Sequence, residues 1–324
     1  MNEIKWGIIG CGDVTEVKSG PAFNKVANSS LVAVMRRYAE KAADYAKRHG
    51  VPKWYNDAQA LIDNPEINAV YIATPPSSHK AYAIAAMQAG KHVYVEKPMA
   101  LSAVECKEMV EAAEQFGVKL AVAHYRRQVP IFKAIKSIID NGAIGDIRFA
   151  ELKMLQSIKP SLVAQTATNW RTDPSVSGGG LFHDLAPHQI DLMLNFFGEV
   201  LQYSGLSCNQ TKTSTADDIV SGQILFKNGV IFNGLWCFNV PENESTDLCT
   251  IIGSKGKITF AVFGNTIETT IEGHVEKKAF NMPEHIQQPM IAKVVAYFLG
   301  NEENPCSGGI GLQVMEIIDK FSGK

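Results

Sequence analysis

Residues 4–15 read Ile4-Lys5-Trp6-Gly7-Ile8-Ile9-Gly10-Cys11-Gly12-Asp13-Val14-Thr15, an apolar run that leads directly into a Gly-x-Gly loop. Gly10 permits a tight turn after a strand, and Gly12 lets the backbone N–H groups of a following helix approach a pyrophosphate. Thr15 stands where a third small residue is usual, so the motif is degenerate and also compatible with an ordinary glycine turn. As a dinucleotide site, the loop would supply Gly10, Cys11, Gly12, Asp13 and Val14.

A second apolar run, at residues 30–35, gives the spacing of a βαβ unit, because a helix-length segment separates it from the first run. Arg36 and Arg37 follow it, where an NAD-binding fold carries the Asp or Glu that binds the ribose 2′-hydroxyl. A guanidinium group matches the geometry and charge of a 2′-phosphate instead. The sequence therefore favours NADP as the cofactor over NAD, although two solvated arginines at a strand end are the simpler interpretation.

The composition describes an ordinary enzyme-sized chain of 324 residues, long enough for two domains. Its 31 Lys and Arg residues nearly balance 33 Asp and Glu residues, so we expect no nucleic-acid or membrane partner. The six cysteines form no C-x-x-C pair and no cluster with metal spacing, which favours free thiols and no bound metal. The apolar runs are short, so we expect no transmembrane or secretory segment and a cytoplasmic location.

Residues 1–124 alternate strand-like and helix-like segments, which predicts a Rossmann domain with a doubly wound parallel sheet. An apolar strand at residues 69–74 stops at Pro75-Pro76, and a strand at residues 92–95 delivers Glu96-Lys97-Pro98. Ligands bind open α/β sheets at this carboxyl edge, where the Lys97 ammonium could stabilise a substrate alkoxide. A surface lysine paired with Glu96 is the alternative.

Residues 125–324 predict a second α/β domain with a large, mostly antiparallel open sheet. Segments that alternate by twos follow Gln202, and Lys227-Asn228-Gly229 is a hairpin signal between two of them. Two closing helices, near residues 285–299 and 311–321, would cover a face of this sheet or return to the first domain.

Three glycines open the segment 178–191, which carries Asp184, His188 and Asp191. In a helix these three residues share one face, and a carboxylate beside an imidazole forms a usable proton-transfer pair. Pro187 complicates such a helix, because an interior proline removes a hydrogen bond. Asp184 as a helix cap and His188 as a buried core histidine are equally compatible with the pattern.

The order of these motifs resembles the Gfo/Idh/MocA oxidoreductase family over nearly the whole chain. The resemblance is carried by the Gly-x-Gly loop, Thr74-Pro75-Pro76-Ser77-Ser78-His79, Glu96-Lys97-Pro98, Tyr125-Arg126-Arg127, Asn169-Trp170-Arg171, and Gly178-Gly179-Gly180 followed by Asp184 and His188. It implies a Rossmann domain, NADP or NAD as cofactor, and a second domain whose open sheet often forms homodimers or homotetramers.

The resemblance also implies roles for individual residues. Lys97, Asp184 and His188 would act on the substrate, with His188 as the proton donor or acceptor. Tyr125 and Arg127 would face the substrate. The nicotinamide side of the cofactor site would consist of Thr74, Pro75, His79, Glu96 and Lys97, with Trp170 and Arg171 closing over it.

Family substrates are mostly sugars, cyclitols and related polyols, oxidised at a secondary alcohol or reduced at a ketone. We therefore expect an NADP-preferring oxidoreductase of this chemistry. Ala186-Pro187 and the hydroxyl-rich residues 157–168 depart from the common pattern, and the second departure leaves the substrate open. The alternatives are a dinucleotide-binding sensor without activity and an enzyme that resembles dihydrodiol dehydrogenases or reduces imines or enones.

Overall fold

The computed structural model describes residues 2–158, 162 and 170–324. Asn169 and most of the hydroxyl-rich segment 157–168 lie outside these residues. The described chain forms two compact units: Met1–Tyr125 with Pro283–Met315, and Arg126–Met282 with Glu316–Lys324. The segment 283–315 is thus part of the first unit, which agrees with the alternative that a closing helix returns to the first domain.

The first unit is built on a six-stranded parallel sheet with the strand order β3-β2-β1-β4-β5-β6. Its strands are β1 Ile4–Ile9, β2 Ser29–Met35, β3 Lys53–Tyr55, β4 Ala69–Ile72, β5 His92–Val95 and β6 Leu120–Val122. The order reverses between β1 and β4, which is the switch point where doubly wound sheets bind ligands. The central strands are almost fully buried, as their continuous apolar sequences predict.

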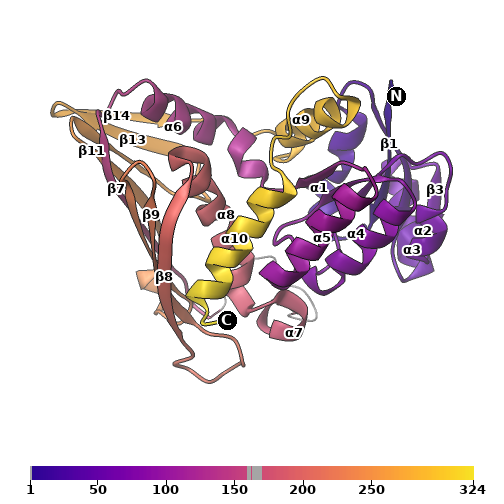
Figure 1. The fold of residues 1–324 in the computed structure, drawn as a ribbon, viewed down its shortest axis with the longest axis horizontal. Helices are drawn as coiled ribbons and strands as arrows, with labels where there is room; N and C mark the ends of the chain where they lie inside the picture. Colours follow the sequence, from indigo (N-terminus) through magenta and orange to yellow (C-terminus); the bar gives the residue numbers. More distant parts are fainter. Residues whose placement is uncertain (1, 159–161, 163–169) are drawn as a thin grey trace. The chain divides into compact units, whose positions relative to one another are not determined.

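Helices connect these strands and flank the sheet, and α4 and α5 lie side by side (Figure 1). The helical segments are α1 Asp13–Val17, η1 Gly20–Asn24, α2 Ala39–His49, α3 Ala58–Ile62, η2 Pro76–Ser78, α4 His79–Gln88, α5 Ala103–Gln115 and α9 Gln288–Leu299. Gly50 ends α2 in the left-handed conformation, and the Ser102 hydroxyl caps α5 by accepting from the Glu105 amide.

The second unit contains an eight-stranded sheet with the order β14-β13-β12-β11-β7-β10-β9-β8. Its strands are β7 Ile147–Leu155, β8 Val200–Cys208, β9 Ile219–Phe226, β10 Ile231–Cys237, β11 Thr246–Gly253, β12 Gly256–Phe260, β13 Thr266–Ile271 and β14 His274–Ala279. Only the β7–β10 pair is parallel among these neighbours. The expected Rossmann sheet and the expected large, mostly antiparallel sheet are both confirmed.

Helices α6 (Pro130–Asp140) and α8 (Gly180–Phe197) pack against one face of this sheet (Figure 1). Aromatic side chains form the interface, including Phe132 against Phe260 and Phe182 against Trp236. Short helices η3 (Tyr125–Gln128), η4 (Trp170–Thr172), α7 (Pro174–Ser177) and η5 (Glu242–Glu244) complete the unit, and α10 (Gly308–Phe321) is divided between the two units. The opposite face of the sheet carries exposed apolar residues such as Leu206 and Ile231.

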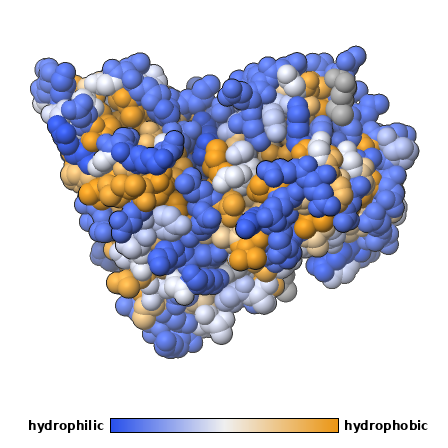
Figure 2. All heavy atoms as spheres, in the orientation of Figure 1, coloured by the Kyte–Doolittle hydropathy of each residue, from blue (hydrophilic) through white to orange (hydrophobic). Residues whose placement is uncertain are grey.

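Most expected elements are present, including the hairpin at residues 227–229, where Gly229 has a φ of +87°. Sequence analysis missed β3, β13 and β14, which are short or strongly polar strands. No helix among the described residues is long and apolar enough to cross a membrane. Hydrophilic residues cover much of the face drawn in Figure 2, with smaller groups of hydrophobic residues between them.

Candidate active site

The glycine loop follows β1 and turns sharply at Gly10, whose φ is +96°. A Cβ atom at Gly10 would lie 2.7 Å from Thr74 Cγ2 and 2.8 Å from Thr74 N. Glycine is therefore needed at position 10 for two reasons: the positive φ, and the close approach of the segment after β4. The structure brings the predicted cofactor residues Gly10 and Thr74 into contact.

Gly12 differs from Gly10, because a Cβ atom there would find no heavy atom closer than the Gly10 carbonyl oxygen at 3.9 Å. The chain itself thus leaves open space at Gly12. Gly12 also caps α1, whose first-turn amides, at Asp13 and Val14, have no partner within the helix. Open space beside such amides fits a pyrophosphate group, so these residues suit a dinucleotide.

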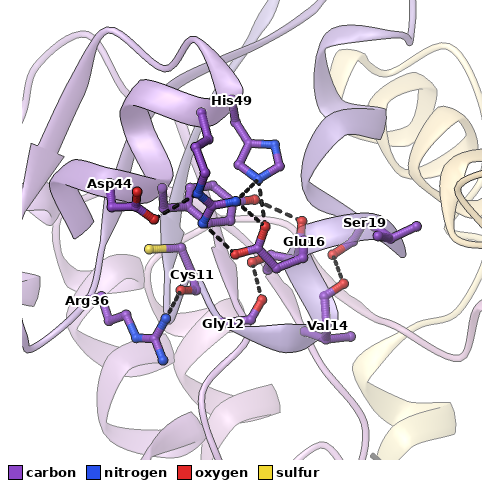
Figure 3. A network of polar contacts seen from close by, with 12 residues as sticks. Cys11, Gly12, Val14, Glu16, Ser19, Arg36, Asp44 and His49 are labelled. Carbon is purple, nitrogen blue, oxygen red and sulfur yellow. Dashed lines mark hydrogen bonds and ion pairs between the residues drawn. The ribbon is translucent and has the colours of Figure 1, made fainter. Parts of the chain in front are cut away.

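A polar network fixes α1 against α2 next to this loop (Figure 3). Arg48 donates to both oxygens of Glu16 at 2.8 Å, and His49 Nε2 lies 2.8 Å from Glu16 Oε2. Hydrogen bonds from Arg48 hold the pKa of Glu16 at about 2, well below its ordinary value. Tyr45, which also lies on α2, donates from its hydroxyl to the Thr15 carbonyl at 2.8 Å. Glu16 therefore serves to anchor the loop.

Arg36 and Arg37 follow β2 directly, as the sequence indicates. Arg36 Nη1 donates to the Cys11 carbonyl at 3.3 Å, which places one guanidinium beside the glycine loop (Figure 3). Arg37 is exposed, and Cys11 is fully buried, with burial raising the pKa of its thiol to about 11. Cys11 thus contributes its backbone to the loop and no reactive thiolate.

Thr74, Pro75 and His79 lie together at the carboxyl end of β4 and the start of α4. The buried His79 ring lies 2.8 Å from the Thr74 carbonyl through Nε2 and 3.0 Å from the Pro98 carbonyl through Nδ1. Burial lowers the pKa of His79 from its ordinary value. His79 therefore ties the segment after β4 to the segment after β5.

Glu96 follows β5 directly, with only 6% of its surface exposed, and its carboxylate faces the interior of the first unit. The Tyr71 hydroxyl donates to Glu96 Oε1, and Gln287 Nε2 donates to the same oxygen at 2.6 Å. Glu96 Oε2 accepts from the Lys97 amide at 3.2 Å. The Glu96 carboxylate thus fixes the backbone that carries Lys97, and the expected place of Glu96 on the nicotinamide side stays a prediction. The Lys97–Pro98 peptide bond is cis.

The glycine run of the second unit makes close contacts with its own chain. A Cβ atom at Gly179 would lie 2.2 Å from His183 Nδ1, and one at Gly180 would lie 2.6 Å from Ala216 Cβ. The Gly178 carbonyl accepts from Lys324 Nζ at 2.5 Å. Burial lowers the pKa of His183 to about 3. These glycines permit the tight packing in which α8 begins.

Helix α8 continues through Pro187, so Asp184 and His188 lie one turn apart on one face, with Asp191 a turn further. Asp184 is not the N-cap residue, because the helix starts four residues earlier at Gly180. Asp184 Oδ2 accepts from Arg171 Nε at 3.1 Å. The Arg171 guanidinium lies over the Trp170 ring at 4.4 Å, so the structure joins these predicted residues.

Two further predicted residues, Tyr125 and Arg127, lie at η3. Arg127 Nε lies 2.9 Å from both carboxylate oxygens of Asp191, and both side chains are almost fully buried. Arg127 thus neutralises Asp191 on the face of α8 that also carries Asp184 and His188, and its expected contact with the substrate stays a prediction. Tyr125 is 6% exposed.

Sequence reasoning missed several residues that contact the predicted ones. Tyr71 and Gln287 bind Glu96, and the Phe263 ring meets the His188 ring edge to face, with 5.7 Å between centroids. Tyr71 lies within a recognisable strand, but nothing in the local sequence around Gln287 or Phe263 signals a neighbour so distant in the chain.

A parallel doubly wound sheet with an open glycine loop after its first strand is typical of a dinucleotide-binding domain. The chain belongs to the Gfo/Idh/MocA oxidoreductase family: residues 4–124 match its NAD-binding Rossmann fold, and residues 132–259 match the GFO/IDH/MocA C-terminal domain. The expected family is thereby confirmed.

Three relatives illustrate this membership. Oxidoreductase P35 of Formosa agariphila is 52% identical over 322 residues, 99% of each chain. 1,5-Anhydro-D-fructose reductase of Ensifer adhaerens is 30% identical over 230 residues, which cover 70% of this chain and 67% of that protein. A structure of levoglucosan dehydrogenase with NADH and levoglucosan superposes with a TM-score of 0.85 and 24% identity, covering 98% of this chain and 96% of that one, and supports the fold.

Proposed function

We propose that the protein is an NADP-preferring dehydrogenase or reductase that acts on a secondary alcohol or ketone of a sugar, cyclitol or related polyol. The observation that carries this proposal is the uninterrupted α8, which sets Asp184 and His188 one turn apart on one face. The names of relatives support the substrate class, since a 1,5-anhydro-D-fructose reductase and a levoglucosan dehydrogenase are among them.

The bound nicotinamide would supply or accept the hydride. His188 takes the proton of the substrate hydroxyl during oxidation and returns it during reduction, as a general base and acid. Asp184 orients the reacting group, and Arg171, whose Nε lies 3.1 Å from Asp184 Oδ2, balances the negative charge of this carboxylate. Lys97 donates a hydrogen bond to the substrate oxygen and stabilises the developing alkoxide.

The NADP preference rests on Arg36, whose guanidinium adjoins the glycine loop, and on Arg37 next to it. Titration of the purified protein with NADPH and NADH, followed by nicotinamide fluorescence, should show tighter NADPH binding. Arg36→Ala combined with Arg37→Ala should weaken NADPH binding about 100-fold or more and leave NADH binding nearly unchanged, because each charge-assisted hydrogen bond contributes roughly 1.5–3 kcal/mol.

The matched control is Arg148→Ala, an exposed arginine on β7 of the second unit. Equal loss of NADPH and NADH binding in the double variant would contradict the 2′-phosphate assignment. Equal binding of the two nucleotides by the unaltered protein would contradict the NADP preference.

Turnover is tested with a panel of polyols and keto-sugars that includes levoglucosan and 1,5-anhydro-D-fructose. Lys97→Met and His188→Asn should each lower kcat by about 100-fold or more, the usual size of one general-base or oxyanion contribution, while NADPH still binds. Binding of NADPH without turnover of any compound would favour the dinucleotide-binding sensor instead.

A homo-oligomer formed through the outer face of the eight-stranded sheet belongs to the same proposal. Leu206, Ile231 and Leu248 are exposed on this face, and Leu206 retains 80% of its surface accessible. Such a row of apolar residues is typical of a surface that another chain covers. Sedimentation should therefore give a dimer or tetramer, and the cytoplasmic location remains a prediction.

A further inference from the structure

The loop between β12 and β13 brings Phe263 to the imidazole of His188, although the two residues are 75 positions apart in the chain. The ring centroids are 5.7 Å apart and the ring planes are inclined by 81°. Aromatic pairs favour such an edge-to-face arrangement, and it restricts how either ring can rotate. Phe263 is only partly buried, so packing in the core does not explain its position.

Two charged residues from other elements hold this loop in place. The Asp247 carboxylate, on β11, accepts from the Val262 amide at 3.1 Å and from the Phe263 amide at 2.6 Å. Arg126 donates to the Val262 carbonyl at 2.6 Å, and its guanidinium lies over the Phe263 ring, 4.2 Å from the centroid. The loop is therefore fixed from both sides, and the orientation of the Phe263 ring with it.

We propose that Phe263 is a positioning residue that sets the orientation of the His188 imidazole, and that Asp247 and Arg126 hold Phe263 in place. This inference rests on the proposed function, because a fixed imidazole matters only when His188 moves a proton. A general base must lie within hydrogen-bond reach of the proton it takes, so rotation of the ring lowers the rate of the proton transfer. Binding of the dinucleotide by the first unit does not depend on this contact.

The test compares Phe263→Leu with Phe263→Tyr and with Phe280→Leu. Phe280 is a suitable control because it is also partly buried, follows a strand of the same sheet, and has the Lys278 ammonium 5.4 Å from its ring. Phe263→Leu should lower kcat about 2- to 12-fold, the range that corresponds to one edge-to-face aromatic pair. Phe263→Tyr should retain the rate, and the Kd for NADPH should not change in any variant.

Asp247→Asn provides a second variant that leaves Phe263 itself intact. An amide offers one acceptor where two backbone N–H groups need two, so the loop loses part of its support. We expect kcat to fall in the same direction as in Phe263→Leu.

A readout without substrate comes from NMR of the protein labelled at the histidine ring carbons, with His188 assigned by the loss of its signal in His188→Asn. The His188 signal should move in Asp247→Asn, which keeps the Phe263 ring and weakens only its support, and stay in place in Phe280→Leu. An unmoved signal, or a rate for Phe263→Leu equal to that of Phe280→Leu, would overturn the positioning role and leave the proposed function intact. Lack of turnover by the unaltered protein would overturn the proposed function, and the positioning role with it.

Discussion

Two segments of this molecule are rich in glycine, but the structural reason for glycine differs between them. In the first unit, a Cβ atom at Gly12 would meet no heavy atom closer than 3.9 Å. In the second unit, a Cβ atom at Gly179 would lie 2.2 Å from the His183 ring. The space beside Gly12 is thus left open by the protein's own atoms, whereas the space beside Gly179 is occupied by the His183 ring.

The difference indicates that the glycine at position 12 serves ligand binding and the glycine at position 179 serves close packing. An extended backbone at Gly12, with φ of −130°, accommodates any residue, so the fold does not require glycine there. Glycine at this position is explained by a group that approaches the α1 amides from outside. At Gly179 the glycine is explained by α8 itself, because the His183 ring packs directly against the backbone.

Gly12→Ala should therefore show the largest effect, and it should affect binding alone. A methyl group in the open space would separate a pyrophosphate from the α1 amides and remove about two charge-assisted hydrogen bonds. We expect the Kd for NADPH to rise about 100-fold, measured by nicotinamide fluorescence. The free energy of unfolding should remain that of the unaltered protein, and a large loss of stability would contradict the comparison.

Gly179→Ala should have the opposite effect, a loss of stability without a loss of NADPH binding. The His183 ring cannot give way by 1 Å without moving α8, so we expect a loss of about 1–3 kcal/mol in the free energy of unfolding, measured in urea. Adding His183→Ala should recover part of this loss, because the two groups that collide are then smaller. NADPH binding should be unchanged, and Gly12→Ala serves as the control with an unobstructed methyl group.

The fold could be predicted well from sequence because its signals are local. The glycine loop after β1, the proline stop after β4 and the hairpin at Gly229 each lie within a few residues of the element that they define. The strongly polar strand β14 was missed because all its residues are exposed, so no apolar face marks it. The return of residues 283–315 to the first unit depends on contacts between distant segments.

The candidate site could be predicted less completely, for the same physical reason. A helix places Asp184 and His188 on one face, so this pair follows from spacing. The hydrogen-bond partners of the site residues do not follow from spacing. Gln287 contacts Glu96 although the two are 191 positions apart in the chain, and Arg127 contacts Asp191 across 64 positions. A charged residue that sequence assigns to the substrate can therefore be neutralised by a partner that only the fold supplies.

The smallest expected effect concerns His183, which the glycine comparison places in a packing role. Burial lowers the pKa of His183 to about 3, so the folded protein binds its proton less readily than the unfolded chain, whose histidines titrate near 6.5. Stability is then complete above pH 6.5 and falls as the pH drops from 6.5 toward 3, with a loss of about 1 kcal/mol between pH 7 and pH 5.5.

His183→Leu removes this titration, so its free energy of unfolding should depend less on pH across that range, measured by urea unfolding at several pH values. His274→Leu, on the exposed strand β14, should retain the dependence of the unaltered protein. An unchanged slope in His183→Leu would mean that the ring accepts a proton in the folded state. Close packing against Gly179 would then tolerate a charge, and the packing explanation of the second glycine segment would fail.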